Sequence, residues 1–177
     1  MRIEVLLGDI TTQQVDAIVN AAHESLLGGG GVDGAIHAAA GPELLAACQE
    51  VRRTSYPDGL PTGQAVATAG GLLPARYVIH TVGPRHWEHD GGGAHLLRDC
   101  HLHALEAADK VGAGSIAFPA ISCGAFGWSA GDAAPIAVAA VRDYERSHPD
   151  SSIETVRFVL FNPAVLAAFE AAVSAVE

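Results

Sequence analysis

The segment GGGGVDG at residues 28–34 places a single carboxylate, Asp33, directly after four consecutive glycines. Glycines that lead into a helix expose backbone N–H groups, and the positive end of the helix dipole favours a bound anion. A carboxylate beside that anion would be repelled unless it faces an uncharged part of the same ligand. We therefore expect the loop amides to bind phosphates. Asp33, held ionised by the helix end, is expected to accept a hydrogen bond or a proton from a hydroxyl-bearing part of the ligand.

Simpler interpretations of this segment stay open. The glycines can serve only to permit tight turns, and Asp33 can serve only to stabilise the first turn of a helix. Gly29, Gly31 and Gly34 satisfy the pattern GxGxxG, but a dinucleotide-binding turn begins directly after its strand, whereas HESLLG intervenes here after Ala22. No lysine follows the glycines, which excludes a Walker A loop.

Two other segments offer groups that suit the same kind of ligand. Asp9, in LLGDIT at 6–11, follows an expected strand and either caps a turn or accepts a hydrogen bond from an exocyclic amine. The segment SCGAFG at 122–127 is a second loop rich in backbone amides. Its aromatic residue, Phe126, either covers a ribose or fills the core, which is the commoner role of phenylalanine.

Histidine and cysteine spacing argues against a metal site. His101 and His103 lie two residues apart, so they point to different faces of a helix. The pair at 86 and 89 is equally weak as evidence for a zinc site. Cys100 shares a helix face with His103, but it also belongs to the apolar stripe of that helix. Cys123 would be a nucleophile only beside a base such as His37 or His80.

The elements that must position these residues alternate between strand and helix. Such alternation predicts an α/β sheet covered on both faces, in which ligands bind in the loops beyond the strand ends. The two glycine-rich loops follow the expected strands at 17–21 and 115–119, and a further loop is expected at 86–93. The other strands are expected at 3–7, 65–69, 77–82 and 156–161. Helices are expected at 34–40, 43–54, after 93, at 133–146 and from 163. The strands at 3–7 and 17–21 should be buried on both faces.

Composition narrows the class of protein. The 177 residues suit one domain, and 49% hydrophobic with 17% charged residues is typical of a compact globular chain. The sequence has no apolar run near ~20 residues and no signal peptide, and its three cysteines form no CxxC pair, so we expect a cytoplasmic protein. The net charge of −10 and the single lysine argue against nucleic-acid binding. We expect a monomer that does not bind membranes.

Six motifs occur together and in order between about residue 3 and residue 170. They are GDIT (8–11), VNAA (19–22), GGGGVDGAIHAAAG (28–41), PTGQAVAT (61–68), YVIHTVGP (77–84) and FPAISCGAFG (118–127). Together they resemble the macrodomain family, and most closely its MacroD-type branch, which includes bacterial O-acetyl-ADP-ribose deacetylases. The resemblance implies one macrodomain over residues 1–177. It also implies a three-layer α/β/α sandwich around a mixed six- or seven-stranded sheet, with an ADP-ribose cleft along the strand ends.

The resemblance also implies roles for individual residues. Asp33 matches the catalytic aspartate, and Asn20 matches a structural or ribose-proximal asparagine. The remaining matches are to binding residues: Asp9 with the adjacent backbone of Ile10 for adenine; Gly30, Gly31 and Val32 for the diphosphate; and Ser122, Cys123, Gly124, Ala125 and Phe126 for the diphosphate and distal ribose.

One position departs from the family pattern. The family motif NAAN is NAAH here, so His23 stands where an asparagine holds the distal ribose. Two functions follow from the resemblance. The first is hydrolysis, without a metal or diffusible cofactor, of O-acetyl-ADP-ribose or of mono-ADP-ribose esters on acidic protein side chains. The second is an ADP-ribose-binding module that has lost turnover because imidazole geometry differs from that of an amide.

Overall fold

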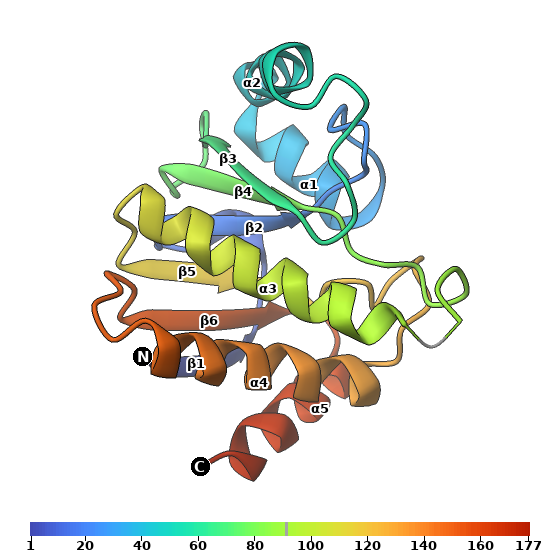
Figure 1. Ribbon diagram of the computed structural model, residues 1–177. Helices are drawn as coiled ribbons and strands as arrows, with labels where there is room; N and C mark the ends of the chain where they lie inside the picture. The colour runs from blue at the N-terminus through green and yellow to red at the C-terminus, as the bar shows by residue number, and fades with distance from the viewer. Residues whose placement is uncertain (91) are drawn as a thin grey trace.

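The computed structural model describes residues 1–90 and 92–177, so residue 91 of the expected loop at 86–93 lies outside the described residues. The described strands form one six-stranded sheet in the order β1-β6-β5-β2-β4-β3 (Figure 1). All neighbouring strands are parallel except β3 and β4, which are antiparallel. The strands are β1 (Arg2–Leu7), β2 (Ala17–Ala21), β3 (Ala65–Ala69), β4 (Tyr77–Thr81), β5 (Ser115–Phe118) and β6 (Thr155–Leu160).

Five α-helices in the described part of the chain cover the two faces of this sheet. They are α1 (Gly31–Ala40), α2 (Pro42–Thr54), α3 (Gly93–Lys110), α4 (Ala130–Ser147) and α5 (Pro163–Ala175). Helices α3, α4 and α5 share one core cluster, while α1 and α2 share the other. Figure 1 shows α3 and α4 crossing in front of the strands. The predicted three-layer α/β/α arrangement around a mixed sheet is confirmed, with six strands.

Alternation along the central strands supplies both cores. On β2, Val19 packs toward α3–α5 and its neighbour Ile18 packs toward α1 and α2. On β4, Ile79 and Val78 divide in the same way, because successive side chains of a strand point to opposite faces. The expectation of burial on both faces holds for β2 and fails for β1. Strand β1 pairs with β6 alone in the described sheet, so its residues are exposed or half-buried.

Helix α1 begins earlier than the sequence indicates. The predicted start at residue 34 is wrong, because the helix begins at Gly31 with Gly30 as its N-cap. Glycine is the poorest helix former after proline, which is why the propensity argument placed the start too late. The consequence is that Asp33 belongs to the first helical turn and is buried. No described helix is long and apolar enough to cross a membrane.

Two fully buried histidines should make the fold sensitive to acid. Burial lowers the pKa of His80 from 6.5 to about 3 and that of His101 to about 4. Each histidine therefore stabilises the fold above pH 6.5, where folded and unfolded forms are both neutral. That stability is lost as the pH falls toward the folded pKa, because the unfolded chain binds the proton first. The loss at pH 5 should be about 2 kcal/mol per histidine.

The measurement is the free energy of unfolding at pH 7.5 and at pH 5 for the wild type and for His101→Leu. Removing His101 should reduce the difference between the two pH values by about half. If the difference in unfolding free energy between pH 7.5 and pH 5 is the same in His101→Leu as in the wild type, His101 does not contribute to the loss of stability in acid.

Candidate active site

The loops that follow β2 and β5 leave the same edge of the sheet. The two strands are parallel neighbours, with Ala17 opposite Ile116 and Ile18 opposite Ala117. Parallel neighbours end on the same side, so the glycine-rich loop before α1 and the segment after Phe118 both begin at this edge. The topology therefore places the two predicted loops in one region of the molecule.

A cavity of about 470 Å³ opens at this edge. It is bounded by the loop after β1, the first turns of α1, the start of the segment after β5, and the end of β6. Four predicted binding residues line it, namely Asp9, Ile10, Gly31 and Val32, together with Gly8, Ala35, Pro119, Val159 and Phe161. Of the segment after β5 only Pro119 belongs to the lining, and residues 122–126 of the second loop lie outside it. Phe161, which is 80% exposed, is a lining residue that the motifs did not indicate.

Within the described residues, Asp9 uses one of its two carboxylate oxygens as an acceptor. Its Oδ1 accepts hydrogen bonds from the backbone N–H of Thr11 at 2.9 Å and from the Thr11 hydroxyl at 2.7 Å. These bonds cap the short 3₁₀ helix η1 (Ile10–Thr12), so the capping interpretation is confirmed. Asp9 Oδ2 forms no hydrogen bond with a described residue, and it remains able to accept one from a ligand in the cavity.

The first turn of α1 presents uncapped amides. Gly30 is the N-cap, and no side chain of a described residue caps the N–H groups that follow it. These N–H groups lack intrahelical acceptors by geometry, and they suit an anion. The turn is also compact, because a Cβ on Gly34 would lie 2.6 Å from the carbonyl oxygen of Gly29. The fourth position of this helix therefore requires glycine.

Asp33 turns toward β2 and does not line the cavity, and its side chain is 5% exposed. Its Oδ1 accepts a hydrogen bond from Nδ2 of Asn20 at 2.9 Å, and its Oδ2 accepts a longer one, 3.4 Å, from the backbone N–H of His23. Nε2 of His37 lies 3.5 Å from Oδ1. The structure therefore brings together Asp33, Asn20 and His23, three residues that the sequence analysis singled out.

The sequence indicates His37 only as a possible base for Cys123. Its actual neighbour is Asp33, one helical turn earlier, and this i, i+4 spacing was the signal that could have identified the pair. Cys123 has no such base in the described structure, where its Sγ faces the carbonyl of Ile121. Burial also raises the pKa of the Cys123 thiol to about 11, which opposes a thiolate nucleophile at neutral pH.

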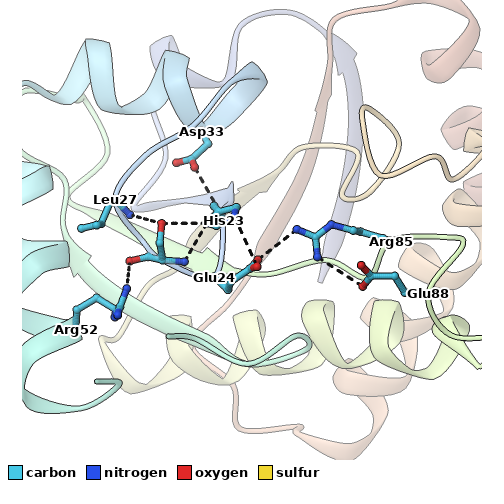
Figure 2. Close-up of polar contacts among 8 residues, drawn as sticks. His23, Glu24, Leu27, Asp33, Arg52, Arg85 and Glu88 are labelled. Atoms are coloured by element: carbon cyan, nitrogen blue, oxygen red, sulfur yellow. Dashed lines mark hydrogen bonds and ion pairs between the residues drawn. The ribbon is translucent and has the colours of Figure 1, made fainter. Parts of the chain in front are cut away.

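His23 contacts Asp33 through its backbone, while its ring turns away (Figure 2). Ring Nδ1 accepts a hydrogen bond from the backbone N–H of Ser25 at 3.1 Å and lies 2.9 Å from the Ser25 hydroxyl. An asparagine side chain makes the same bond two residues ahead in an Asx turn. The histidine ring thus supplies the acceptor of this turn through Nδ1, and its Nε2 lies 3.6 Å from Oε1 of Glu24.

Arg85 links the segments around this centre, and no sequence motif indicated it. Its guanidinium lies 3.5 Å from carboxylate oxygens of both Glu24 and Glu88, and 4.7 Å from the centre of the Phe126 ring. Figure 2 shows the arginine between the two glutamates. Phe126 is half-buried beneath this guanidinium and belongs to neither core cluster. Backbone hydrogen bonding lowers the pKa of Glu24, and His23 and Arg85 lower it further.

The second loop, residues 122–127, combines a strained backbone at Ser122 with a run of backbone N–H groups that are unpaired within the part of the chain that the structure describes. Ser122 adopts the left-handed φ of 68°, although it is not glycine, and a Cβ on Gly83 would lie 2.2 Å from its hydroxyl oxygen. Backbone strain of this kind is concentrated at functional sites. The backbone N–H groups of Gly124, Ala125 and Phe126 have no acceptor among the described residues. They are therefore available to an anionic ligand.

The remaining histidines show no arrangement for a metal. No three His, Cys, Asp or Glu side chains among residues 1–90 and 92–177 are grouped so that they could hold an ion. Nδ1 of His101 lies 2.8 Å from the carbonyl of Leu97, and Nδ1 of His103 lies 2.6 Å from that of Gly63.

The fold agrees with comparison to known proteins. The family model for the macro domain matches residues 19–137, and the chain belongs to this family. A macro domain-containing protein of Streptomyces griseus is 53% identical over 168 residues, which cover 95% of this chain and 92% of that protein. The O-acetyl-ADP-ribose deacetylase of Escherichia fergusonii is 53% identical over 161 residues, with coverage of 91% and 89%.

Two solved structures show the same architecture. The Oceanobacillus iheyensis macrodomain with ADP superposes with a TM-score of 0.92 at 41% identity, and the match covers 98% of this chain and 90% of that one. The Trypanosoma brucei macrodomain in complex with ADP-ribose gives a TM-score of 0.86 at 39% identity, with coverage of 97% and 68%.

Proposed function

We propose that this chain binds ADP-ribose derivatives and hydrolyses esters on their distal ribose. The substrates would be O-acetyl-ADP-ribose, with release of acetate, or mono-ADP-ribose esterified to acidic protein side chains. One observation supports the proposal most directly. A carboxylate, Asp33, is held by two hydrogen-bond donors within the first turn of a helix whose N-terminal amides are uncapped. The E. fergusonii relative named as a deacetylase supports the same reaction class.

The cavity suits the adenosine end of the ligand. Asp9 Oδ2 would accept a hydrogen bond from the exocyclic amine, and the exposed ring of Phe161 offers a stacking face on the same lining. The diphosphate would then lie against the N–H groups at the start of α1 and those of Gly124–Phe126. Binding through neutral amides agrees with a chain whose net charge is −10.

The distal ribose would extend from the diphosphate toward Asp33. Two buried polar atoms beside this carboxylate, Oδ1 of Asn20 and Nε2 of His37, have no hydrogen-bond partner among the described residues. A water molecule or a ribose hydroxyl at this point would satisfy them, as buried polar groups require. We infer that this is where the reacting water or hydroxyl is held.

Asp33 would orient or deprotonate that water. The water oxygen attacks the acyl carbon, the bond from this carbon to the ribose oxygen breaks, and the proton from the water passes to the ribose oxygen. Free ADP-ribose and the carboxylic acid are the products, and all atoms are supplied by substrate and water. The donors from Asn20 and His23 fix the carboxylate before substrate binds, which is the pre-organisation that catalysis by positioning requires.

The direct test is calorimetric titration of the purified protein with ADP-ribose, together with acetate release from O-acetyl-ADP-ribose. Saturable binding and turnover would support the hydrolase. Binding without acetate or ADP-ribose release from either substrate class would favour the binding module, and failure to bind ADP-ribose would overturn both functions.

His23→Asn is expected to raise the rate of acetate release by about fivefold, which corresponds to one hydrogen bond of about 1 kcal/mol. The asparagine Oδ1 can take over the bond from Ser25 N–H, and its Nδ2 adds a donor toward the distal ribose. His23→Gln is the control, since its longer side chain misplaces the oxygen relative to Ser25. Acetate release that appears only in His23→Asn would identify the wild type as a binding module.

A further inference from the structure

A line of buried polar side chains runs from strand β3 to Asp33. Thr68 on β3 has its hydroxyl oxygen 2.9 Å from Nε2 of His80 on β4. Nδ1 of His80 lies 3.2 Å from Nδ2 of Asn20 on β2, and the same Nδ2 is 2.9 Å from Oδ1 of Asp33. The adjacent register of β2 and β4 places Asn20 directly opposite His80. All four residues are at least nine-tenths buried.

The hydrogen-bond directions along this line follow from the groups themselves. An amide nitrogen can only donate, so Nδ2 of Asn20 gives one hydrogen to Asp33 and the other to His80. Nδ1 of His80 must therefore be the unprotonated acceptor. Burial, with a further contribution from nearby His37, keeps this ring neutral. Its single proton then lies on Nε2 and is donated to the Thr68 hydroxyl, with the Cys48 sulfur 3.7 Å away as a weaker neighbour.

The reverse arrangement would remove support from Asp33. If His80 carried its proton on Nδ1, the favourable partner would be the oxygen of Asn20. The amide would then flip and place its oxygen against Oδ1 of Asp33, so that two acceptors would face each other. In the observed orientation, Oδ1 of Asn20 has no partner among the described residues. The direction of the amide is therefore determined by the two acceptors of its NH₂ group, Oδ1 of Asp33 and Nδ1 of His80.

We propose that Thr68 and His80 are positioning residues that act on Asp33 through Asn20. By accepting the hydrogen bond from Nε2, the Thr68 hydroxyl stabilises the His80 tautomer with an unprotonated Nδ1. This nitrogen accepts from the Asn20 amide, and the amide holds the carboxylate in its reactive position. This inference rests on the proposed hydrolase function. Neither Thr68 nor His80 forms a hydrogen bond with Asp33 among the described residues, so the hydrogen bonds that link them to the carboxylate run through Asn20.

Thr68→Val and Thr68→Ser form a matched pair that tests the proposal. Valine keeps the shape and removes the hydroxyl, while serine keeps the hydroxyl. The valine variant should lower kcat for acetate release by about tenfold and leave both KM and the Kd for ADP-ribose unchanged, whereas the serine variant should retain the wild-type kcat. A wild-type kcat in Thr68→Val would overturn the inference, and so would equal losses in the two variants.

A second measurement does not need turnover. The ¹⁵N NMR spectrum of the wild-type imidazoles should show His80 protonated on Nε2 and unprotonated on Nδ1, and Thr68→Val should shift the signal toward the other tautomer. A proton on Nδ1 in the wild type would overturn the inference. If the wild type releases no acetate, the proposed hydrolase function fails separately, and the NMR spectrum decides whether His80 orients Asn20.

Discussion

Asp33→Asn is expected to lower kcat for acetate release by about 1,000-fold, within the range for loss of a general base or orienting carboxylate. The Kd for ADP-ribose should stay within about threefold of the wild type, because Asp33 does not line the cavity proposed for adenosine. The two parameters should separate because the carboxylate acts on the reacting water or hydroxyl, while the amides of the loops bind the diphosphate.

The substitution also has a structural cost that must be measured beside the kinetics. The carboxylate accepts from Asn20 on one oxygen and from the His23 N–H on the other, whereas an amide can accept on only one side. One donor will face the new NH₂ group, which should cost about 1–3 kcal/mol of the free energy of unfolding. Activity should therefore be compared at a temperature where both proteins are folded, as judged by circular dichroism.

Glu43→Gln is the matched control for Asp33→Asn. Glu43 is also an acid in the first turn of a helix, α2, but it is exposed, and the structure gives it no contact with the candidate site. This variant should keep wild-type kcat and Kd. Turnover by Asp33→Asn within about tenfold of the wild type would show that the carboxylate takes no part in the reaction.

The sequence predicted the strands well because their signal is local. A short apolar run such as AIVNA at 17–21 is typical of a buried strand, because a helix usually needs a longer segment. Strand β2 has the predicted bounds. The start of α1 was missed because Gly31 is a poor helix former, and the packing of Val32 and Ile36 in the core stabilises the turn that begins there.

The contacts inside the candidate site are less predictable because they join distant segments. Asn20 meets His80 only because β2 and β4 pair in one register across 60 residues of sequence. Arg85 meets Glu24 and Phe126 through three different loops, and no spacing rule connects them. His23 illustrates a third limit. The identity of the residue was visible in the sequence, but the direction of its ring depends on the local turn with Ser25.

Gly34→Ala is expected to weaken ADP-ribose binding by at least about tenfold and to lower the free energy of unfolding by about 1–3 kcal/mol. The new methyl group would lie 2.6 Å from the carbonyl oxygen of Gly29, a contact that neither backbone can accept without moving. The helix is fixed by the packing of Ile36, so the loop at Gly29 must be displaced. That displacement changes the N–H groups that we propose to bind the diphosphate.

Gly131→Ala provides the opposite expectation for the same chemical change. Gly131 also lies in the first turn of a helix, α4, and a Cβ there meets no atom within 4 Å. Alanine exceeds glycine in helix propensity by about 1 kcal/mol, so this variant should be slightly stabilised and should bind ADP-ribose as the wild type does. Because propensity favours alanine at both positions, any loss in Gly34→Ala measures the close approach of Gly29 alone. Stabilisation of Gly34→Ala to the same extent, with unchanged affinity, would show that the loop does not depend on that approach.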